Sequence, residues 1–370
     1  MHRVIHVGLD VHKQSLDVGA LMNHRDIVLE KHLKHHYPLI EKELVRLADT
    51  YRGTPIACCY EAGPTGFGLA RKLNRLDGIR CTVIAPGSIP KQSGDRVKTD
   101  RRDAMKLAHM FALGVLSEVA IPETEDEMVK ELLRYRNARK EKQKRAKQQL
   151  KSFLLRSGQA SPVPENWTKQ YRSWIQRIDF GSPHAAQVRN GYLDEIAILE
   201  RDLRSLTAQL EAIACSERYA RDMEKLRLLR GIGLITGLSL LTEVGDFTRF
   251  PSAPSFMAWL GLVPSESSSG GRIQKGKLTK TGNGNLRKLL TEASWHYLYR
   301  GNHKSPANQP GSALDERYVV YAQQADKRLR TKQFRMRMAN RKRSTITASA
   351  IARELAGFVW GMMTDHIDLM

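Results

Sequence analysis

Cysteine and long apolar runs are scarce in this chain of 370 residues. Only four cysteines are present, at positions 58, 59, 81 and 215, and their spacing matches no metal-binding motif. This pattern excludes a zinc-finger scaffold and predicts reduced core thiols in a cytosolic protein. No apolar run approaches the roughly 18–20 residues of a membrane-spanning helix. The first predicted strand begins too near residue 1 to leave room for a secretory leader.

Acidic residues are also few relative to basic ones. The chain has 60 lysines and arginines against 39 aspartates and glutamates, so its formal net charge is +21 and its pI is near 9.9. Such an excess usually indicates a nucleic acid or an anionic membrane as partner. Because no membrane segment is predicted, nucleic acid is favoured. The apolar content of 41% predicts a globular protein, long enough for two or three domains.

Residues 1–121 are predicted to form an α/β domain. Strand patterns occur at 3–10, 15–22 and 26–32, and two predicted turns join them, as in a meander. They are followed by alternating helices and strands, predicted at 38–51, 55–61, 66–77, 80–85 and 100–117. This order predicts a mixed sheet covered by helices.

Residues 122–222 are predicted to be helical and strongly basic. One helix spans about 124–157, and a second spans about 185–214. The second helix has a heptad seam, formed by Val188, Tyr192, Ile196, Leu199, Leu203, Leu206, Leu210 and Ile213. The seam predicts a coiled coil between two copies of the chain, favoured by the charged outer face of the helix. Packing of the helix on its own domain is the alternative.

Residues 223–370 form the third predicted region, which is mostly helical. Gly231 and Gly233 flank a hairpin between two predicted helices, and the backbone N–H groups of such a helix-hairpin-helix can hold a DNA phosphate. An ordinary helix turn with a glycine cap is the alternative. A polar loop rich in serine and glycine is predicted at 264–272, and a basic run lies within the C-terminal helices at 327–343.

Basic side chains in all three regions suit the backbones of DNA and RNA. A solvated helix face is the alternative for each charge run. The residues that we expect to contact nucleic acid, beside the two hairpin glycines, are Arg101, Arg102, Arg139, Lys140, Lys144, Arg145, Arg272, Lys275, Lys277 and Lys280.

Four carboxylates give the most specific indication of chemistry. Asp10 and Glu61 each end an apolar strand, at the sheet edge where ligands collect in α/β folds. Asp100 and Asp103 lie three residues apart on one helix face. Any one acid alone would be a solvated surface charge, but together they offer four hard oxygen donors, which suit Mg²⁺ or Mn²⁺. The set predicts a metal-dependent nuclease-like centre, in which a cation pair clamps a phosphodiester.

Ser269 is a second candidate for chemistry, in the polar loop. The following Gly270 allows close approach of a backbone, and nearby cations can stabilise a phosphoryl transition state. A serine is a poor nucleophile without activation, so the sequence alone favours a linker here.

Several motifs together resemble the DEDD insertion-sequence transposases, the bridge-RNA-guided recombinases that are related to Piv-type DNA invertases. The first half matches with Gly-Leu-Asp-Val-His-Lys around Asp10, Tyr-Glu-Ala-Gly around Glu61 and Lys-Thr-Asp-Arg-Arg-Asp-Ala across Asp100 and Asp103. The second half matches with Arg-Gly-Ile-Gly, Phe-Pro-Ser, Ala-Trp-Leu-Gly-Leu-Val-Pro-Ser, a Ser-Gly step and Lys-Thr-Gly-Asn. The resemblance covers residues 4 to 300.

The resemblance implies an RNase H-like (RuvC-like) domain at 1–121, a coiled-coil middle at 122–222 and a transposase domain at 223–370. It also implies that Asp10, Glu61, Asp100 and Asp103 bind the divalent metal and that Ser269 attacks DNA, with Ser267 and Ser268 as alternative nucleophiles. The expected partners are donor and target DNA, a structured guide RNA and further copies of the chain, as a dimer or tetramer. We expect the protein in the cytoplasm of a bacterial or archaeal cell, near the nucleoid.

Three other functions remain compatible with the sequence. The chain could be a structure-selective nuclease of the resolvase type, in which Ser269 is only part of a loop. It could be a DNA invertase of the Piv type. It could also be a nucleic-acid-binding protein with a relict, non-catalytic site.

Overall fold

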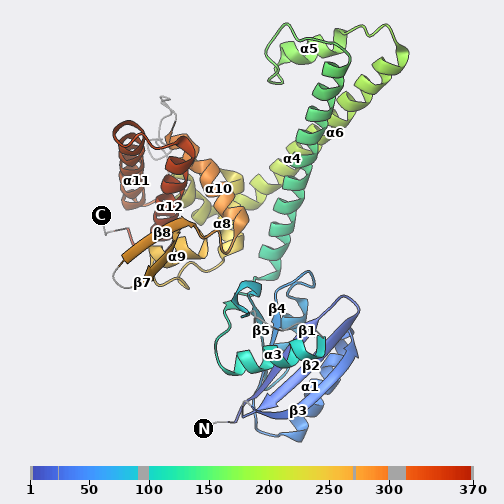
Figure 1. Cartoon of the computed structure of the whole chain (residues 1–370), viewed down its shortest axis with the longest axis vertical. Helices are drawn as coiled ribbons and strands as arrows, with labels where there is room; N and C mark the ends of the chain where they lie inside the picture. Colours follow the sequence, from blue (N-terminus) through green and yellow to red (C-terminus); the bar gives the residue numbers. More distant parts are fainter. Residues whose placement is uncertain (1–2, 24, 91–99, 270–271, 299–313, 368–370) are drawn as a thin grey trace. The chain divides into compact units, whose positions relative to one another are not determined.

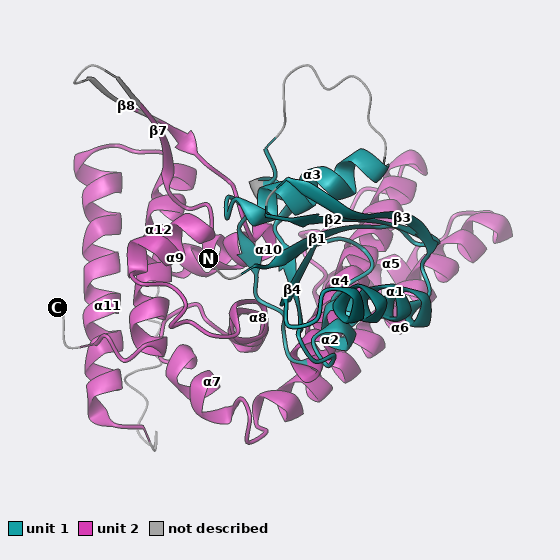
Figure 2. Ribbon diagram, turned by 90° about the horizontal axis from the view of Figure 1, so that it is seen from below, with its two compact units in different colours: residues 1–123 teal, residues 124–370 magenta. Residues whose placement is uncertain are grey.

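The computed structural model describes residues 3–23, 25–90, 100–269, 272–298 and 314–367. The chain divides into two compact units, residues 1–123 and 124–370 (Figures 1 and 2). The first unit ends two residues after the predicted boundary. The finer division of the second unit at residue 222 stays a prediction, because both of its parts belong to one compact unit.

The first unit is a mixed sheet of six strands with helices on both faces, as the sequence predicts. The sheet order is β3-β2-β1-β4-β5-β6. The first three strands form an antiparallel meander, β4 and β5 run parallel to β1, and β6 is antiparallel to β5. Their bounds are Ile5–Val11, Ser15–Met22, Asp26–Lys34, Ile56–Glu61, Ile79–Ile84 and Glu118–Val119. The two-residue strand β6 was not predicted.

The helices of this unit cover opposite faces of the sheet (Figure 2). Side chains alternate along each strand, and the fully buried Ile5, Val7 and Leu9 of β1 join the core under α1 (Tyr37–Thr50) and α2 (Gly68–Leu73). The other face packs on α3 (Asp100–Ala112), where Leu107 contacts Cys59 and Ile84. A short 3-10 turn, η1 (Pro86–Ser88), follows β5.

Two of these helices are shorter than predicted. Helix α2 ends at Leu73 because the side chain of Asn74 bonds both the backbone N–H of Cys81, at 2.6 Å, and its carbonyl, at 3.0 Å. Helix α3 ends at Ala112, two residues before Gly114, which has a φ of +67°. A left-handed glycine is a common helix terminator.

Among the residues that the structure describes, the second unit is helical apart from one β-hairpin. Helices α4 (Thr124–Arg156) and α6 (Pro183–Ala214) run side by side, with α5 (Lys169–Arg177) at one end of the pair (Figure 1). The remaining elements are α7 (Ala220–Arg227), α8 (Leu234–Val244), α9 (Ala253–Trp259), β7 (Pro264–Ser269), β8 (Arg272–Leu278), α10 (Gly284–Ser294), the 3-10 turn η2 (Trp295–Tyr297), α11 (Glu316–Phe334), the π-helical turn η4 (Arg335–Ala339) and α12 (Ser344–Met363). Helix α5 and the hairpin were not predicted.

The heptad seam of α6 packs along α4 of the same chain. Ile196 and Leu199 share a core with Leu150 and Leu154 of α4, and Leu210 shares another with Leu133. The structure therefore favours the alternative interpretation, packing within one chain, for the seam's buried part. Only Val188, at the start of α6, is left 44% exposed. Pairing between copies remains a prediction.

Ion pairs reinforce the contact between α4 and α6. Arg172 of α5 donates two hydrogen bonds of 2.8 Å to the Glu200 carboxylate, and Lys147 of α4 lies 3.3 Å from it. Arg139 of α4 pairs with Asp202 of α6. These contacts leave little of Glu200 exposed, since its side chain is 16% accessible.

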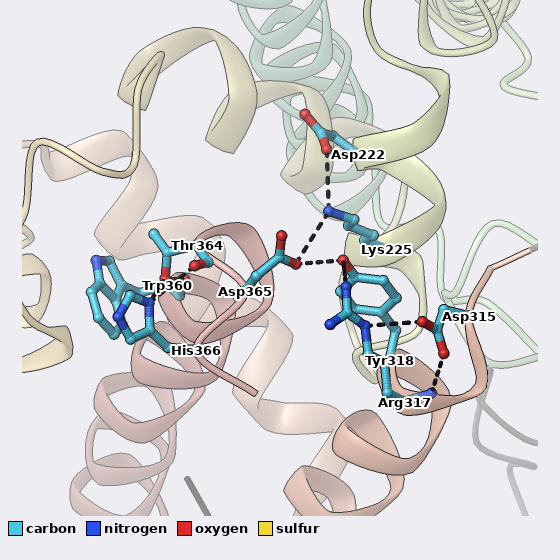
Figure 3. Close-up of polar contacts among 9 residues, drawn as sticks. All are labelled: Asp222, Lys225, Asp315, Arg317, Tyr318, Trp360, Thr364, Asp365 and His366. Carbon is cyan, nitrogen blue, oxygen red and sulfur yellow. Dashed lines mark hydrogen bonds and ion pairs between the residues drawn. The ribbon is translucent and has the colours of Figure 1, made fainter. Parts of the chain in front are cut away.

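A polar cluster fixes the chain after α12 (Figure 3). The Lys225 side chain of α7 is 8% exposed, and its ammonium group lies 3.7 Å from the Asp365 carboxylate and faces the Tyr318 ring at 4.7 Å. The Tyr318 hydroxyl donates a hydrogen bond to Asp365. The His366 ring packs against Trp360 in a tilted arrangement, with 4.7 Å between centroids. A buried lysine is stabilised only when it is paired, so this cluster ties α7, α11 and the end of α12 together.

The buried cysteines agree with the prediction of reduced core thiols, with one exception. Cys58, Cys59 and Cys81 are free and buried, and burial raises the pKa of Cys81 to about 12. Cys215, however, is exposed at the C-terminal cap of α6, so its assignment to the core was wrong. No described helix is both long enough and apolar enough to cross a membrane.

Replacing Glu200 with glutamine should destabilise the helical pair. Hydrogen bonds from Arg172 lower the pKa of Glu200 below its ordinary value, although burial opposes them. Stability from this carboxylate is therefore present above its unfolded-state pKa and is lost as the pH falls through the lower folded-state value. At pH 7 we expect Glu200→Gln to cost about 1–3 kcal/mol, seen as a lower midpoint in thermal unfolding. The variant should also lose less stability than the parent between pH 7 and pH 3.

The matched control is Glu195→Gln, on the exposed side of α6. It should leave both the midpoint and its pH dependence unchanged. Equal effects of the two variants would contradict a specific role for the Glu200 contacts.

Candidate active site

The first two predicted acids lie side by side at the carboxyl ends of the two central strands, β1 and β4. Leu9 of β1 pairs with Tyr60 of β4 in parallel register, so the next residues, Asp10 and Glu61, also fall opposite one another. Alternation along the strands places both side chains on the face that α3 covers. Asp10 is half-buried and Glu61 is exposed. The strand ends thus bring two carboxylates together on one face, as the sequence predicts.

Helix α3 packs very closely on this face, because β1 and β2 offer glycine there. A Cβ atom on Gly8 would stand 2.1 Å from the carbonyl oxygen of Ala104 and 2.5 Å from the backbone nitrogen of Ala108. Gly19, the partner of Gly8 in β2, lies equally close to Met105. The backbone of α3 therefore rests directly on the sheet.

The direction of α3 brings its acids toward Asp10. At its C-terminal end, Phe111 contacts His6 near the start of β1, with 5.9 Å between ring centroids. Ala104 lies over Gly8, further along β1. The first turn of α3, with Asp100 and Asp103, is accordingly directed toward the carboxyl end of β1. Asp103 is half-buried, and the side chain of Asp100 lies outside those that the structure describes.

Asp17 extends the row of acids and was missed from the sequence. It pairs with Asp10 in antiparallel register, which puts the two Cβ atoms about 5 Å apart. Asp17 is 3% exposed, and its carboxylate lies 2.9 Å from Nδ1 of His32 in β3. The signal was available, since Asp17 interrupts an otherwise apolar strand, and such an acid is costly to bury without a partner.

His12 also contacts the site. Its Nε2 lies 3.2 Å from the Asp10 carboxylate, just beyond the end of β1. His12 belongs to the Gly-Leu-Asp-Val-His-Lys motif around Asp10, but the sequence alone indicates no role for it. The contact can fix the rotamer of Asp10 and so orient its oxygens.

The acids have the chemistry of a divalent metal site, because β1, β4 and α3 each contribute carboxylates, and carboxylate oxygens are hard donors. Among the described side chains, however, no group of three or more His, Cys, Asp or Glu residues is arranged to hold a metal ion. Because Asp100 falls outside that set, the predicted group of four is only partly described. The placement of Asp10, Glu61 and α3 fits the predicted ligand set at the level of strand register and helix packing.

Ser269 lies in a β-hairpin rather than in a loop. It is the last residue of β7, in register with Arg272 at the start of β8. The prediction of a loop was wrong, because polar residues such as serine can also pair in a two-stranded ribbon. The side chains of Ser268, Ser269, Arg272 and Lys275 lie outside the described set.

The base of this hairpin is held by two glycines from the matched motifs. A Cβ atom on Gly282 would stand 1.9 Å from the carbonyl oxygen of Trp259, and one on Gly261 would stand 2.3 Å from that of Thr281. Both glycines have positive φ, and Arg287 donates hydrogen bonds to the carbonyls of Leu260 and Thr281. These motifs therefore join the segments before and after the hairpin.

Some of the residues predicted to contact nucleic acid on α3 and α4 are exposed, and others form ion pairs within the protein. Lys140, Lys144 and Arg145 are exposed on α4. Arg139 instead pairs with Asp202 within the α4–α6 contact. On α3, Arg102 is exposed, and Arg101 lies 2.9 Å from Glu30 of β3.

The residues predicted in the C-terminal part also differ in their surroundings. Gly231 has a φ of +84°, and a Cβ atom there would stand 2.5 Å from the carbonyl oxygen of Ala293. It therefore has a packing role, whereas Gly233 caps α8 and is exposed. Lys277 and Lys280 are exposed at and after the end of β8.

Comparisons with known proteins assign both units. Residues 7–158 match a transposase model of the DEDD type, and residues 223–308 match the model described as Transposase IS116/IS110/IS902 family. The transposase for insertion sequence element IS1533 of Leptospira borgpetersenii is 32% identical over 354 residues, covering 93% of this chain and 99% of that protein. This chain belongs to the IS110 family of insertion-sequence transposases.

Other relatives agree. The protein y4qE of Sinorhizobium fredii is 39% identical over 308 residues, or 82% of this chain and 74% of that protein. The transposase for insertion sequence element IS1328 of Yersinia enterocolitica is 26% identical over 313 residues, or 82% of this chain and 87% of that protein. The transposase is thus an enzyme that cuts and recombines DNA, as predicted from the motifs. The first matched segment contains all four acids, and the second contains the serine hairpin.

Gly8→Ala should damage the transposase through the position of α3. A methyl group there would overlap the backbone of α3 rather than a flexible side chain, so the helix must shift. We expect a loss of about 1–3 kcal/mol in stability, the usual cost of overpacking, and a larger proportional loss of DNA cleavage. Thermal unfolding and a cleavage assay measure the two effects.

Gly87→Ala serves as the control, because a Cβ atom there meets nothing within 4 Å. Wild-type stability and cleavage in Gly8→Ala would show that α3 does not depend on this contact.

Proposed function

We propose that the first unit is an RNase H-like catalytic domain in which Asp10, Glu61, Asp100 and Asp103 hold Mg²⁺ or Mn²⁺. The sheet order supports the fold, because an antiparallel meander is extended by two strands parallel to β1. The observation that carries the proposal is the register of Asp10 and Glu61, on the face that α3 covers. When bound, such a cation activates the attacking oxygen and offsets charge on the phosphoryl group.

The protein's own residues supply the geometry. The contact of Gly8 with Ala104 fixes α3 against β1 and so sets the height of Asp103 above the sheet edge. His12 orients the Asp10 carboxylate. Arg102, exposed on the first turn of α3, is suited to hold the DNA phosphate beside the acids.

Ser269 is the proposed nucleophile of strand exchange. Its Oγ attacks a DNA phosphorus atom, and the new serine–phosphate bond forms as the bond to one deoxyribose oxygen breaks. The serine proton passes to that released hydroxyl group. The next two residues in the sequence are glycines, which lack a side chain and so permit close approach of a DNA backbone. We also propose that the chain acts as an assembly of two or four copies.

A structured RNA is proposed to select the DNA. Base pairing between this guide and donor and target DNA would supply sequence specificity. The net charge of +21 and the exposed Lys140, Lys144 and Arg145 of α4 support binding of nucleic-acid backbones. The hairpin of Gly231 and Gly233 before α8 is a further proposed phosphate contact.

Asp103→Asn tests the metal site. The amide keeps the shape of the side chain but removes one anionic ligand, so we expect Mn²⁺ affinity to fall at least about tenfold and cleavage to be lost. Mn²⁺ binding is measured directly by electron paramagnetic resonance, without DNA. Asp49→Asn, exposed on α1 over the opposite face of the sheet, is the control. Undiminished Mn²⁺ binding by Asp103→Asn would remove Asp103 from the ligand set and favour a relict site.

Ser269→Ala tests the nucleophile. With DNA carrying the ends of the element and its RNA, we expect the parent chain to form a covalent protein–DNA adduct that survives SDS gel electrophoresis. Ser269→Ala should form none, whereas Ser267→Ala and Ser268→Ala should form it at parental levels. Loss of the adduct only in one of those two controls would move the nucleophile to that residue. Cleavage without any adduct in the parent chain would favour a structure-selective nuclease.

A further inference from the structure

A basic groove lies between α11 and α12 and includes the start of the C-terminal basic run at 327–343. It has a volume of about 800 Å³, and its lining includes Lys327, Arg328, Thr331, Lys332, Arg335 and Glu354. The residues from α11 recur every three or four positions, so they form one face of the helix. The groove is therefore built by a continuous helical stripe facing α12.

The groove is cationic with a single internal acid. Glu354 of α12 is 14% exposed, accepts a hydrogen bond of 2.5 Å from Lys332 and pairs with Arg328. These pairs hold two cations at the groove while cancelling only one charge. Lys327 and Arg335 have no acidic partner among the described residues. Four cations against one carboxylate attract an anion.

The size of the charged stripe indicates a polyanion. Lys327 and Arg335 are eight residues apart, or about 12 Å along a helix, which exceeds the reach of a single phosphate. Basic residues continue beyond the groove, where Arg337, Arg341, Lys342 and Arg343 are all exposed. A chain of phosphates matches such an extended row better than a small ion does.

Exposed apolar side chains next in sequence to the groove residues indicate an unpaired strand. Phe334 and Met338 are each 57% exposed. Neither residue lines the groove, but Phe334 follows Lys327 by seven residues, or about two helical turns, so the two side chains lie on neighbouring parts of the helix surface. An exposed aromatic ring beside cations is typical of sites where unpaired bases stack. The π-helical turn of Arg335–Ala339 begins directly after Phe334, and such turns are frequent at functional sites.

We infer that the α11–α12 groove binds an unpaired nucleic-acid segment, with its phosphates on Lys327 and Arg335 and a base stacked on Phe334. The inference rests on the proposed action of the transposase on nucleic acids, but not on the acids or on Ser269. An acidic peptide is less well matched, since it would not use the exposed aromatic ring.

Binding of fluorescein-labelled 20-nucleotide RNA, single-stranded DNA and duplex DNA of one sequence tests the inference. Anisotropy is measured with the full chain in EDTA, over a series of salt concentrations. For Lys327→Glu with Arg335→Glu, we expect affinity for the single strands to fall at least about tenfold, and the salt slope to fall by about 1.4, as two lost phosphate contacts predict. Phe334→Ala should weaken single-strand binding about fivefold or more without changing that slope.

Two controls make the result specific. Arg201→Glu with Arg204→Glu makes the same charge change on exposed α6 and should weaken all three probes far less. Lys327→Gln with Arg335→Gln avoids new repulsion and should show the same order of effects with a native circular dichroism spectrum. Unchanged binding, equal loss in the α6 variant, or loss confined to duplex DNA would each overturn the inference.

The outcome is separable from the proposed catalytic function. The probes are bound in EDTA, without divalent metal and without cleavage of any bond, so the measurement does not depend on metal binding by the acids or on attack by Ser269. A groove variant that binds normally would refute the groove while leaving the covalent adduct of the parent chain intact. Absence of that adduct would refute the nucleophile while leaving the binding data unaffected.

Discussion

The contact between α3 and β1 is the constraint on which the acidic site depends. The short aspartate side chains of a strand end and a helix meet more readily when the two backbones lie close together, and Gly8 and Gly19 permit that approach because they lack Cβ atoms. The same face carries Asp10, Asp17 and Glu61 in adjacent register positions. The two glycines therefore influence the acidic site indirectly, because they determine how closely α3 packs on the sheet and where its acids lie.

The basic residues of the second unit fall into two groups that cannot be told apart in the sequence. Charged residues of α4 and α6 are divided between ion pairs that join the helices, such as Arg139 with Asp202, and exposed cations such as Lys140 and Lys144. Only the second group can meet a phosphate without first losing a partner. A high density of positive charge is thus a poor guide to contacts, because part of it is used internally.

Much of the fold could be predicted from the sequence, and the reasons for the failures are physical. The strands of the first unit follow runs of buried apolar residues, and β2 was predicted at its observed bounds of 15–22. The hairpin of β7 and β8 was missed because its strands are polar and lack apolar alternation. The seam of α6 has the same period whether its partner is α4 or another chain, so periodicity could not identify the partner. Likewise, the four acids could be proposed from strand ends and helical spacing, whereas Asp17 could be found only from its pairing with Asp10.

Arg230 joins two surfaces that are far apart in sequence. It precedes the glycine hairpin of α7 and α8, is 7% exposed, and donates a hydrogen bond of 2.7 Å to Asp326 of α11. Asp326 also neighbours Arg330, at 3.8 Å. Any rotation of α11 that breaks the first contact would separate a buried guanidinium group from a carboxylate, which is costly. We therefore expect the glycine hairpin and α11 to move together.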